Sequence, residues 1–319
     1  MIHLLATGGT IAMQQDPAAG GNVPALGGQA MLDLVGSLGT EHEVRVEDWE
    51  RLPGVHRGPV ELWALRDRVA AIVSAPDAPV GVVITHGTDT LEETAYLIAR
   101  TVPPQVPVVL TGSMRTSSDL HWDGPRNLRD AVAVAGHPGA RGRGAMVVFA
   151  GGIVDGRDVT KLDAFATDAF GSPHAPLLGA VESGVPRFFR AADPDRPLLP
   201  ATDLARPVAV VSLILGDDGG LVDCARDRFD GLVIEGFGRG NVPPGAVASI
   251  QRWLDAGKPV VLASRCPYGE VGGEYAFEGG GGQLLRLGVV PAGRRPTSLA
   301  RLELALCLSA GMRYGGSPA

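Results

Sequence analysis

Cysteine is scarce in this sequence, and its placement excludes a disulfide-rich fold. Only Cys224, Cys266 and Cys307 occur in 319 residues. They are odd in number and far apart, so they form neither a disulfide framework nor the paired spacing of a zinc site. We expect all three to be small buried residues of a protein from a reducing compartment.

Long apolar runs and blocks of like charge are also missing. No uncharged apolar stretch reaches the roughly 18 residues of a membrane-spanning helix. The first residues, MIHLLATGGT, lack the basic and apolar segments of a secretory signal. A formal net charge of -7 disfavours nucleic acid or an anionic membrane as the main partner. We therefore expect a cytoplasmic protein that binds neither nucleic acid nor membrane.

Several widespread catalytic motifs are absent. Thr7–Thr10 reads TGGT, which does not match the GxGxxG pattern of dinucleotide-binding folds. No Walker A, HExxH or GxSxG pattern occurs. These absences leave phosphoryl transfer, zinc proteolysis and Ser-His-Asp hydrolysis without support.

What the sequence does contain is a regular alternation of strands and helices. The first half predicts buried strands at Ile2–Ala6, Val44–Val46, Val80–Thr85, Val106–Thr111 and Ala145–Ala150, and helices at Val60–Val73, Thr90–Arg100 and Asn127–Ala135. Such alternation indicates a parallel α/β sheet. We expect an irregular, mobile loop at Met13–Gly28 and a hairpin turn at Asp155–Asp158.

A second, smaller α/β region follows a stretch rich in proline and charge, Arg187–Arg206. Its predicted strands are Val208–Leu215, Gly231–Glu235 and Pro259–Ser264, with helices near Gly245–Ala256 and Thr297–Ser309. The predicted organisation is an N-terminal domain at residues 1–190, a linker at 191–206 and a smaller C-terminal domain at 207–319.

The stretch Val80–Thr94 organises the chain, because it joins a buried strand to a helix through a polar loop. Thr90 and Glu93 have the spacing of a capping box, which puts Thr88 and Asp89 between the strand and the helix. In open parallel sheets ligands bind at this edge. If the strands are parallel, Thr10 and Ser113 emerge at the same edge.

These residues have a catalytic and a structural interpretation. A threonine hydroxyl is a weak nucleophile unless a base removes its proton, and Thr88, Asp89 and Lys161 have the chemistry for such a unit. Alternatively, Thr88 and Asp89 are helix caps and Lys161 is a solvated surface residue. Sequence distance alone does not bring Lys161 to Thr88.

Five motifs, in this order and spacing, resemble the bacterial-type L-asparaginase family. They are TGGTIA at Thr7–Ala12, THGTDTLEETAY at Thr85–Tyr96, DGPRNL at Asp123–Leu128, GRDVTK at Gly156–Lys161 and GRGN at Gly238–Asn241. The resemblance covers essentially the whole chain. It implies a larger N-terminal and a smaller C-terminal α/β domain, a homotetramer of intimate dimers, and hydrolysis of L-asparagine to L-aspartate and ammonia without metal or organic cofactor.

The resemblance also implies residue roles. Thr10 would be the nucleophile that forms an acyl-enzyme, with Thr88, Asp89 and Lys161 as a second catalytic group that handles the proton and the attacking water. The N–H groups of Thr10 and Thr88 would hold the oxyanion, and Asp89 would also bind the substrate α-amino group. The implied substrate-binding residues are Gly9, Gly54, Val55, His56, Gly87, Ser113, Met114 and, from a neighbouring subunit, Asn241.

Two departures from the family pattern affect activation and substrate choice. Many members carry a tyrosine on the mobile loop near the nucleophile, whereas this chain has Gly20–Pro24 there, so another residue or a water must activate Thr10. At the α-carboxylate pocket stands Gly54-Val55-His56-Arg57, where His56 or a bidentate Arg57 would bind the carboxylate.

The sequence leaves three alternatives to L-asparagine hydrolysis open. Glutamine is one methylene longer than asparagine, a difference that a simple pocket rejects by only about 1–3 kcal/mol. Val55 and His56 also leave D-asparagine or another ω-amide open as the substrate. A third alternative is a non-catalytic amino-acid sensor on the same scaffold, which the intact set of Thr10, Thr88, Asp89 and Lys161 disfavours.

Overall fold

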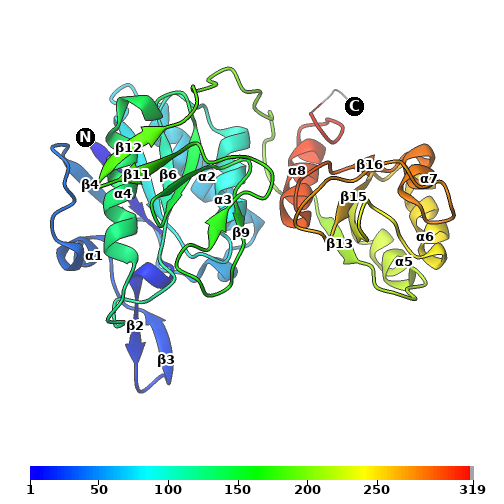
Figure 1. The fold of residues 1–319 in the computed structure, drawn as a ribbon, viewed down its shortest axis with the longest axis horizontal. Helices are drawn as coiled ribbons and strands as arrows, with labels where there is room; N and C mark the ends of the chain where they lie inside the picture. The colour runs from blue at the N-terminus through cyan, green and yellow to red at the C-terminus, as the bar shows by residue number, and fades with distance from the viewer. Residues whose placement is uncertain (317–319) are drawn as a thin grey trace. The chain divides into compact units, whose positions relative to one another are not determined.

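The chain folds into two compact units, which meet in the sequence between Leu198 and Leu199 (Figure 1). A computed structural model describes residues 1–316. The division falls inside the predicted linker, 191–206. The two-domain α/β architecture expected from the sequence is confirmed.

An eight-stranded mixed sheet forms the centre of the first unit, in the order β12-β11-β8-β7-β6-β5-β1-β4. Five of its strands are parallel: β1 (Ile2–Ala6), β4 (Val44–Asp48), β5 (Gly81–Thr85), β6 (Val108–Thr111) and β7 (Ala145–Phe149). The other three, β8 (Gly152–Asp155), β11 (Gly179–Glu182) and β12 (Val185–Phe188), extend it in antiparallel fashion. The parallel sheet expected from the sequence therefore describes only part of this unit.

A tight turn explains the change from parallel to antiparallel pairing. Ala150 and Gly151 have φ angles of 49° and 83°, and they reverse the chain between β7 and β8. The turn predicted at Asp155–Asp158 forms, with the Asp158 N–H donating to the Asp155 carbonyl at 3.0 Å, but it does not close a hairpin. After β8 the chain leaves the sheet, and β9 (Thr160–Lys161) pairs with β10 (Phe170–Gly171) instead.

Helices cover both faces of the sheet (Figure 1). Helices α1 (Gly28–Val35) and α4 (Gly124–Gly136) pack on one face, and α2 (Pro59–Val73) and α3 (Leu91–Thr101) on the other. Val82 and Ile84 of β5 point to the α2–α3 side, and Val83 points to the α1–α4 side. Burial on both faces accounts for the continuous apolar run in this strand.

The segment predicted as an irregular loop contains an ordered hairpin. Strands β2 (Met13–Asp16) and β3 (Gly21–Pro24) pair in antiparallel fashion and project from the unit (Figure 1). The Ser117 hydroxyl donates to the Met13 carbonyl at 3.2 Å, and the Gln15 N–H donates to Ser118 Oγ at 3.0 Å. The irregular structure predicted for Met13–Gly28 is therefore wrong for these strands.

The second unit is built on a four-stranded parallel sheet. Its strands are β13 (Val208–Ser212), β14 (Gly231–Gly236), β15 (Val260–Ser264) and β16 (Val290–Pro291), and its helices are α5 (Gly220–Arg226), α6 (Pro244–Asp255), α7 (Gly281–Leu287) and α8 (Thr297–Ser309). Helix α8 packs against β13, β14 and β15. The three longer strands, α6 and α8 were predicted; α5, α7 and β16 were not.

The cysteines differ from expectation. None of the three forms a disulfide in the described part of the chain, but only Cys307 is buried, so the predicted burial of Cys224 and Cys266 is wrong. Over the span 1–316, no helix is long and apolar enough to cross a membrane.

Candidate active site

The turns that follow β1 and β5 touch backbone to backbone at one edge of the sheet. The two strands run parallel, with Ala6 opposite Thr85. A Cβ atom at Gly9 would lie 2.4 Å from the Gly87 nitrogen, and Gly9 has a φ of 86°. Only glycine permits both this conformation and this approach. The glycine contact therefore brings the Thr10 and Thr88 loops together.

Thr88, Asp89 and Lys161 form a connected group. Lys161 Nζ donates to Thr88 Oγ1 at 3.0 Å and to Asp89 Oδ1 at 2.8 Å, although it lies more than 70 positions further along the chain. The Lys161 backbone N–H donates to Glu92 Oε2 at 2.7 Å, which anchors β9 to the start of α3. A hydroxyl, an amine and a carboxylate in this order can relay a proton.

Burial differs sharply within this group. Thr88 is 6% exposed and the Lys161 side chain is 17% exposed, whereas 68% of the Asp89 side chain is accessible. The hydroxyl and the amine are thus shielded from water. Asp89 keeps carboxylate surface free for a second, cationic partner.

Thr10 has no comparable group around it. It begins a short 3₁₀ helix, η1 (Thr10–Ala12), directly after Gly9, and it is partly exposed. Within the 316 described residues, its hydroxyl makes no hydrogen bond to another residue. The structure therefore brings Thr10 to the Thr88 loop, and in residues 1–316 no base is hydrogen-bonded to its hydroxyl.

The loop after β6 carries Ser113 and Met114, and the start of α4 holds it in place. Both carboxylate oxygens of Asp123 accept backbone N–H groups, from Met114 at 3.0 Å and Arg115 at 2.9 Å. Asn127 Nδ2 donates to the Gly112 carbonyl at 3.0 Å. The roles of Asp123 and Asn127 were not predicted; their four-residue spacing within DGPRNL was the available signal.

His86 lies beneath the Thr88 loop and is fully buried. Its Nδ1 lies 2.8 Å from the Gly87 carbonyl oxygen and its Nε2 lies 3.0 Å from Thr94 Oγ1. Burial, together with the nearby charge of Arg57, lowers the pKa of His86 to about 4, against the opposing effect of the Gly87 hydrogen bond. The imidazole is therefore neutral at neutral pH.

The predicted carboxylate-binding segment divides into an exposed and a buried part. It forms a 3₁₀ helix, η2 (Gly54–His56), in which Val55 and His56 are exposed and Gly54 is buried. The Arg57 side chain is only 3% exposed and is paired with Glu50 at 2.9 Å. The guanidinium is thus engaged inside the protein, which disfavours the bidentate alternative for Arg57; the roles of Arg57 and His56 toward a substrate carboxylate stay predictions.

Two further predictions concern the Thr90 capping box and the position of Asn241. Thr90 is the N-cap residue of α3, but its buried hydroxyl makes no capping hydrogen bond, so the predicted capping box is wrong. Asn241 belongs to the second unit, where its Oδ1 accepts the N–H of Gly281 at the start of α7 at 3.1 Å. Its contribution to a neighbouring subunit's site stays a prediction.

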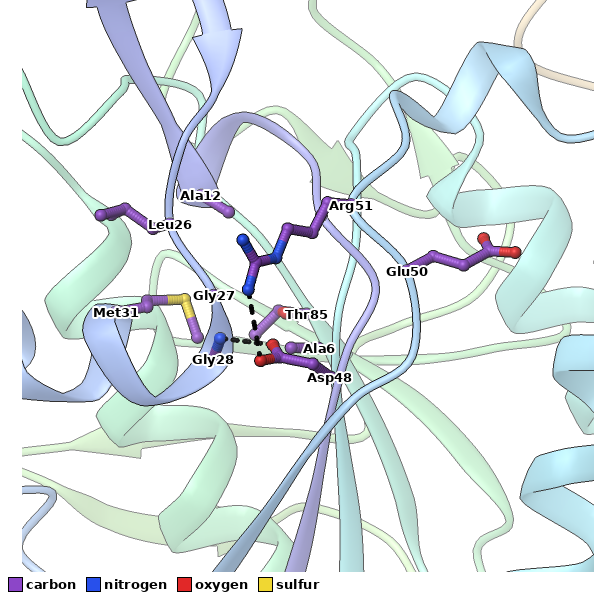
Figure 2. A pocket seen from close by; sticks show the side chains of 11 residues that line it. Ala6, Ala12, Leu26, Gly27, Gly28, Met31, Asp48, Glu50, Arg51 and Thr85 are labelled. Atoms are coloured by element: carbon purple, nitrogen blue, oxygen red, sulfur yellow. Dashed lines mark hydrogen bonds and ion pairs between the residues drawn. The ribbon is translucent and has the colours of Figure 1, made fainter.

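A narrow depression lies at the ends of β1 and β4, beside the hairpin (Figure 2). Asp48 Oδ1 accepts the Gly28 N–H at 2.6 Å, and Arg51 pairs with Asp48 at 3.6 Å. Its walls lie too close together to admit a water molecule, and it includes none of the four catalytic candidates. Among residues 1–316, no group of three or more His, Cys, Asp or Glu side chains is arranged to hold a metal ion.

Two family models match the two halves of the chain. Residues 1–193 match "Asparaginase, N-terminal", and residues 207–315 match "Glutaminase/Asparaginase C-terminal domain". The chain belongs to the asparaginase family. The family assignment made from the five motifs is thereby confirmed.

Named relatives of this asparaginase-family chain match it over nearly its full length. A probable L-asparaginase from Deinococcus radiodurans is 38% identical, with 97% of this chain and 93% of that protein covered. An L-asparaginase from Bacillus licheniformis is 31% identical, with 97% and 95% covered. The crystal structure of a probable cytoplasmic L-asparaginase from Campylobacter jejuni matches with a TM-score of 0.82 at 27% identity, covering 97% of this chain and 94% of that one.

Proposed function

We propose that this chain hydrolyses L-asparagine to L-aspartate and ammonia in the cytoplasm, through a threonine acyl-enzyme. The single observation that carries the proposal is the contact of Lys161 Nζ with Thr88 Oγ1 and Asp89 Oδ1, at the edge where Gly9 brings in Thr10. The relatives named L-asparaginase support the substrate class, and the Campylobacter protein's description as cytoplasmic supports the location.

In the first step the Thr10 hydroxyl oxygen attacks the side-chain amide carbon of asparagine. The proton of the hydroxyl passes to the leaving nitrogen, the C–N bond breaks, and ammonia leaves an aspartyl ester on Thr10. In the second step a water attacks the ester carbonyl and gives a proton to the Thr88 hydroxyl, which passes its own proton to the neutral Lys161 amine. As the ester bond breaks, this proton returns through Thr88 to the Thr10 oxygen, which restores the Thr10 hydroxyl and releases L-aspartate.

Backbone and side-chain groups at the same edge would bind the substrate. The N–H groups of Thr10 and Thr88 would stabilise the oxyanion of each tetrahedral intermediate. The accessible carboxylate of Asp89 would bind the α-amino group. The Ser113 carbonyl oxygen would accept a hydrogen bond from the N–H of the leaving amide nitrogen. Gly9, Gly54, Val55, Gly87 and Met114 would line the site.

The α-carboxylate would be bound by His56. Its side chain is exposed on η2, next to buried Gly54, whereas the neighbouring guanidinium of Arg57 is withdrawn into the protein. A cationic or hydrogen-bonding imidazole supplies the contact that Val55 cannot make.

Glutamine is a second candidate substrate. A glutaminase-asparaginase from Pseudomonas aeruginosa is 33% identical to this chain, with 82% of this chain and 75% of that protein covered. The reacting groups are the same for both amides, so the length of the pocket decides between them.

The assembly that we propose is a homotetramer of intimate dimers, in which Asn241 of a neighbouring subunit closes each site. Asn241 lies in a tight turn at residues 237–241, where the Phe237 and Asn241 backbones bond each other. Asn241 is partly exposed, and this turn, together with the Gly281 contact, fixes the direction of its side chain.

Ammonia release from L-asparagine, D-asparagine and L-glutamine tests the proposal. We expect fast release from L-asparagine and a loss of about 10²- to 10⁴-fold in Lys161→Met, the range for removing a positioned proton-transfer group. His56→Ala should raise the KM for asparagine about tenfold with little change in kcat, as for a lost hydrogen bond to a charged group. Release from D-asparagine alone would reassign the substrate, and binding without release would favour the sensor.

A further inference from the structure

One buried guanidinium connects three loops at the site edge. Arg57 Nε donates to Glu50 Oε2 at 2.9 Å, and Nη2 donates to the Thr7 carbonyl oxygen. Its Nη1 lies 3.4 Å from His86 Nε2. The side chain therefore joins the segment after β4 to the first residue after β1 and to the first residue after β5.

The contacts use all three nitrogens of a charge that is 3% exposed. A buried arginine is costly unless its charge and its donors are satisfied. Here Glu50 supplies the compensating charge, and the two remaining nitrogens face a backbone carbonyl and an imidazole. A guanidinium with a contact at each of its three nitrogens holds its partners at fixed separations, because its donors are fixed in one plane.

We propose that Arg57 is a positioning residue that fixes the Thr10 and Thr88 loops relative to each other for amide hydrolysis. The proposal rests on the function proposed above. In this role Arg57 does not contact substrate but acts through Thr7 and His86.

On the β5 side, the connection runs through a single peptide plane. His86 Nδ1 faces the Gly87 carbonyl oxygen at 2.8 Å, so the ring proton is assigned to Nδ1 and Nε2 is left as the acceptor for Arg57 or Thr94. The Gly87 carbonyl and the Thr88 N–H belong to one planar unit and point in opposite directions. Holding the carbonyl therefore fixes the direction of the N–H proposed to bind the oxyanion.

On the β1 side, Arg57 holds the residue at which the TGGT turn begins. The Thr7 hydroxyl and N–H both donate to the Thr85 carbonyl, at 2.8 and 3.2 Å, so Thr7 is already tied to β5. Arg57 adds a hydrogen bond to the Thr7 carbonyl oxygen, just before Gly8, Gly9 and Thr10 in the chain. Both oxyanion donors thus depend on the same guanidinium.

The test compares Arg57→Ala with Arg66→Ala in the full chain. Arg66 is a matched control, because it also donates to a carboxylate (Asp67), a side chain and a backbone carbonyl (both of Thr101), but lies between α2 and α3. We expect Arg57→Ala to lower kcat about 10²-fold, the scale for a misplacement of about 1 Å, with the KM for L-asparagine within about twofold. Arg66→Ala should leave both constants near wild type.

Two additional readouts separate positioning from mere stability. Millimolar methylguanidinium should restore part of the lost kcat in Arg57→Ala, and should have no effect on Arg66→Ala. Arg57→Lys, which keeps the charge but has one donor centre, should fold and lose kcat to an intermediate degree. If Arg57→Ala fails to fold, Arg57→Lys decides the question.

Several results would overturn the inference. Unchanged kcat in both Arg57 variants would do so, as would a rise in KM at constant kcat, which would make Arg57 a substrate contact. Equal kcat losses in the Arg57 and Arg66 variants would reduce Arg57 to a structural role. If the wild-type chain releases no ammonia from any amide, the proposed function fails and the inference fails with it; if the wild type is active, only the inference is at stake.

Discussion

The two threonine loops at the site edge are neighbours in space but differ in how their hydroxyls are prepared. The Thr88 hydroxyl has Lys161 Nζ at 3.0 Å, and Lys161 in turn has Asp89 at 2.8 Å. The Thr10 hydroxyl, on the residue directly after Gly9 of the glycine contact, bonds to no residue in the span 1–316. One hydroxyl is coupled to a base by the fold itself, and the other is not.

Burial explains the difference. Thr88 is 6% exposed, and a buried hydroxyl requires a partner within the protein. Thr10 is partly exposed, so water can satisfy its hydroxyl. The group proposed to act on the second step is therefore assembled on folding, whereas under the proposed mechanism the proton acceptor for Thr10 must come from water, from substrate or from movement of another residue.

The largest expected effect tests the different roles of the two loops by trapping the aspartyl ester on Thr10. We expect Thr88→Val to release one equivalent of ammonia per site rapidly and then slow by about 10²- to 10⁴-fold, because the ester on Thr10 forms but water is not activated. Thr10→Ala should show no burst. Rapid-quench ammonia measurement and intact mass, which would gain one aspartyl group in Thr88→Val only, check both. A burst in Thr10→Ala would exchange the roles of the two loops.

The contact between the loops predicts the next largest effect. Gly9→Ala places a Cβ 2.4 Å from the Gly87 nitrogen, at φ 86° and ψ 177°, a conformation that glycine alone adopts readily. Strain and overpacking together should lower the free energy of unfolding by about 2–6 kcal/mol and abolish activity. Gly20→Ala is the control: its φ is 70°, but no atom lies within 4 Å, so it should cost about 1 kcal/mol. Urea unfolding of both variants measures the difference, and equal losses would contradict it.

The main parallel strands were predictable because their burial pattern is strong. The run Val82–Ile84 is buried on both faces and its turn residues mark its end. The elements that were missed are short: two residues in β9, β10 and β16, four in β2, β3, β8, β11 and β12, and seven in α5 and α7. Such segments complete too few periods to leave a pattern in sequence.

The site was predictable only in part, for a different reason. Thr88 and Asp89 follow a recognisable strand, but their contact with Lys161 spans more than 70 positions and came from the family resemblance, not from periodicity. Arg57 shows the opposite failure. It was one of two alternatives for the substrate carboxylate, yet it contacts Glu50, Thr7 and His86, and sequence does not show which way a long side chain turns.

The smallest predicted effect is the pH dependence of the free energy of unfolding, and it concerns only the Thr88 loop, through His86. The pKa of His86 is lowered from 6.5 to about 4, so between these values the unfolded chain binds a proton at His86 that the folded chain does not. Stability is therefore fully present above pH 6.5 and falls with decreasing pH by about 1.4 kcal/mol per unit, about 3 kcal/mol in total, with no further loss below pH 4. Urea unfolding across pH 4–7 should show this slope in wild type and in His121→Asn, an exposed control, but not in His86→Asn. Equal slopes in wild type and His86→Asn would mean that protonation is not excluded beneath Thr88, and that the Gly87 peptide is held by something other than a neutral imidazole.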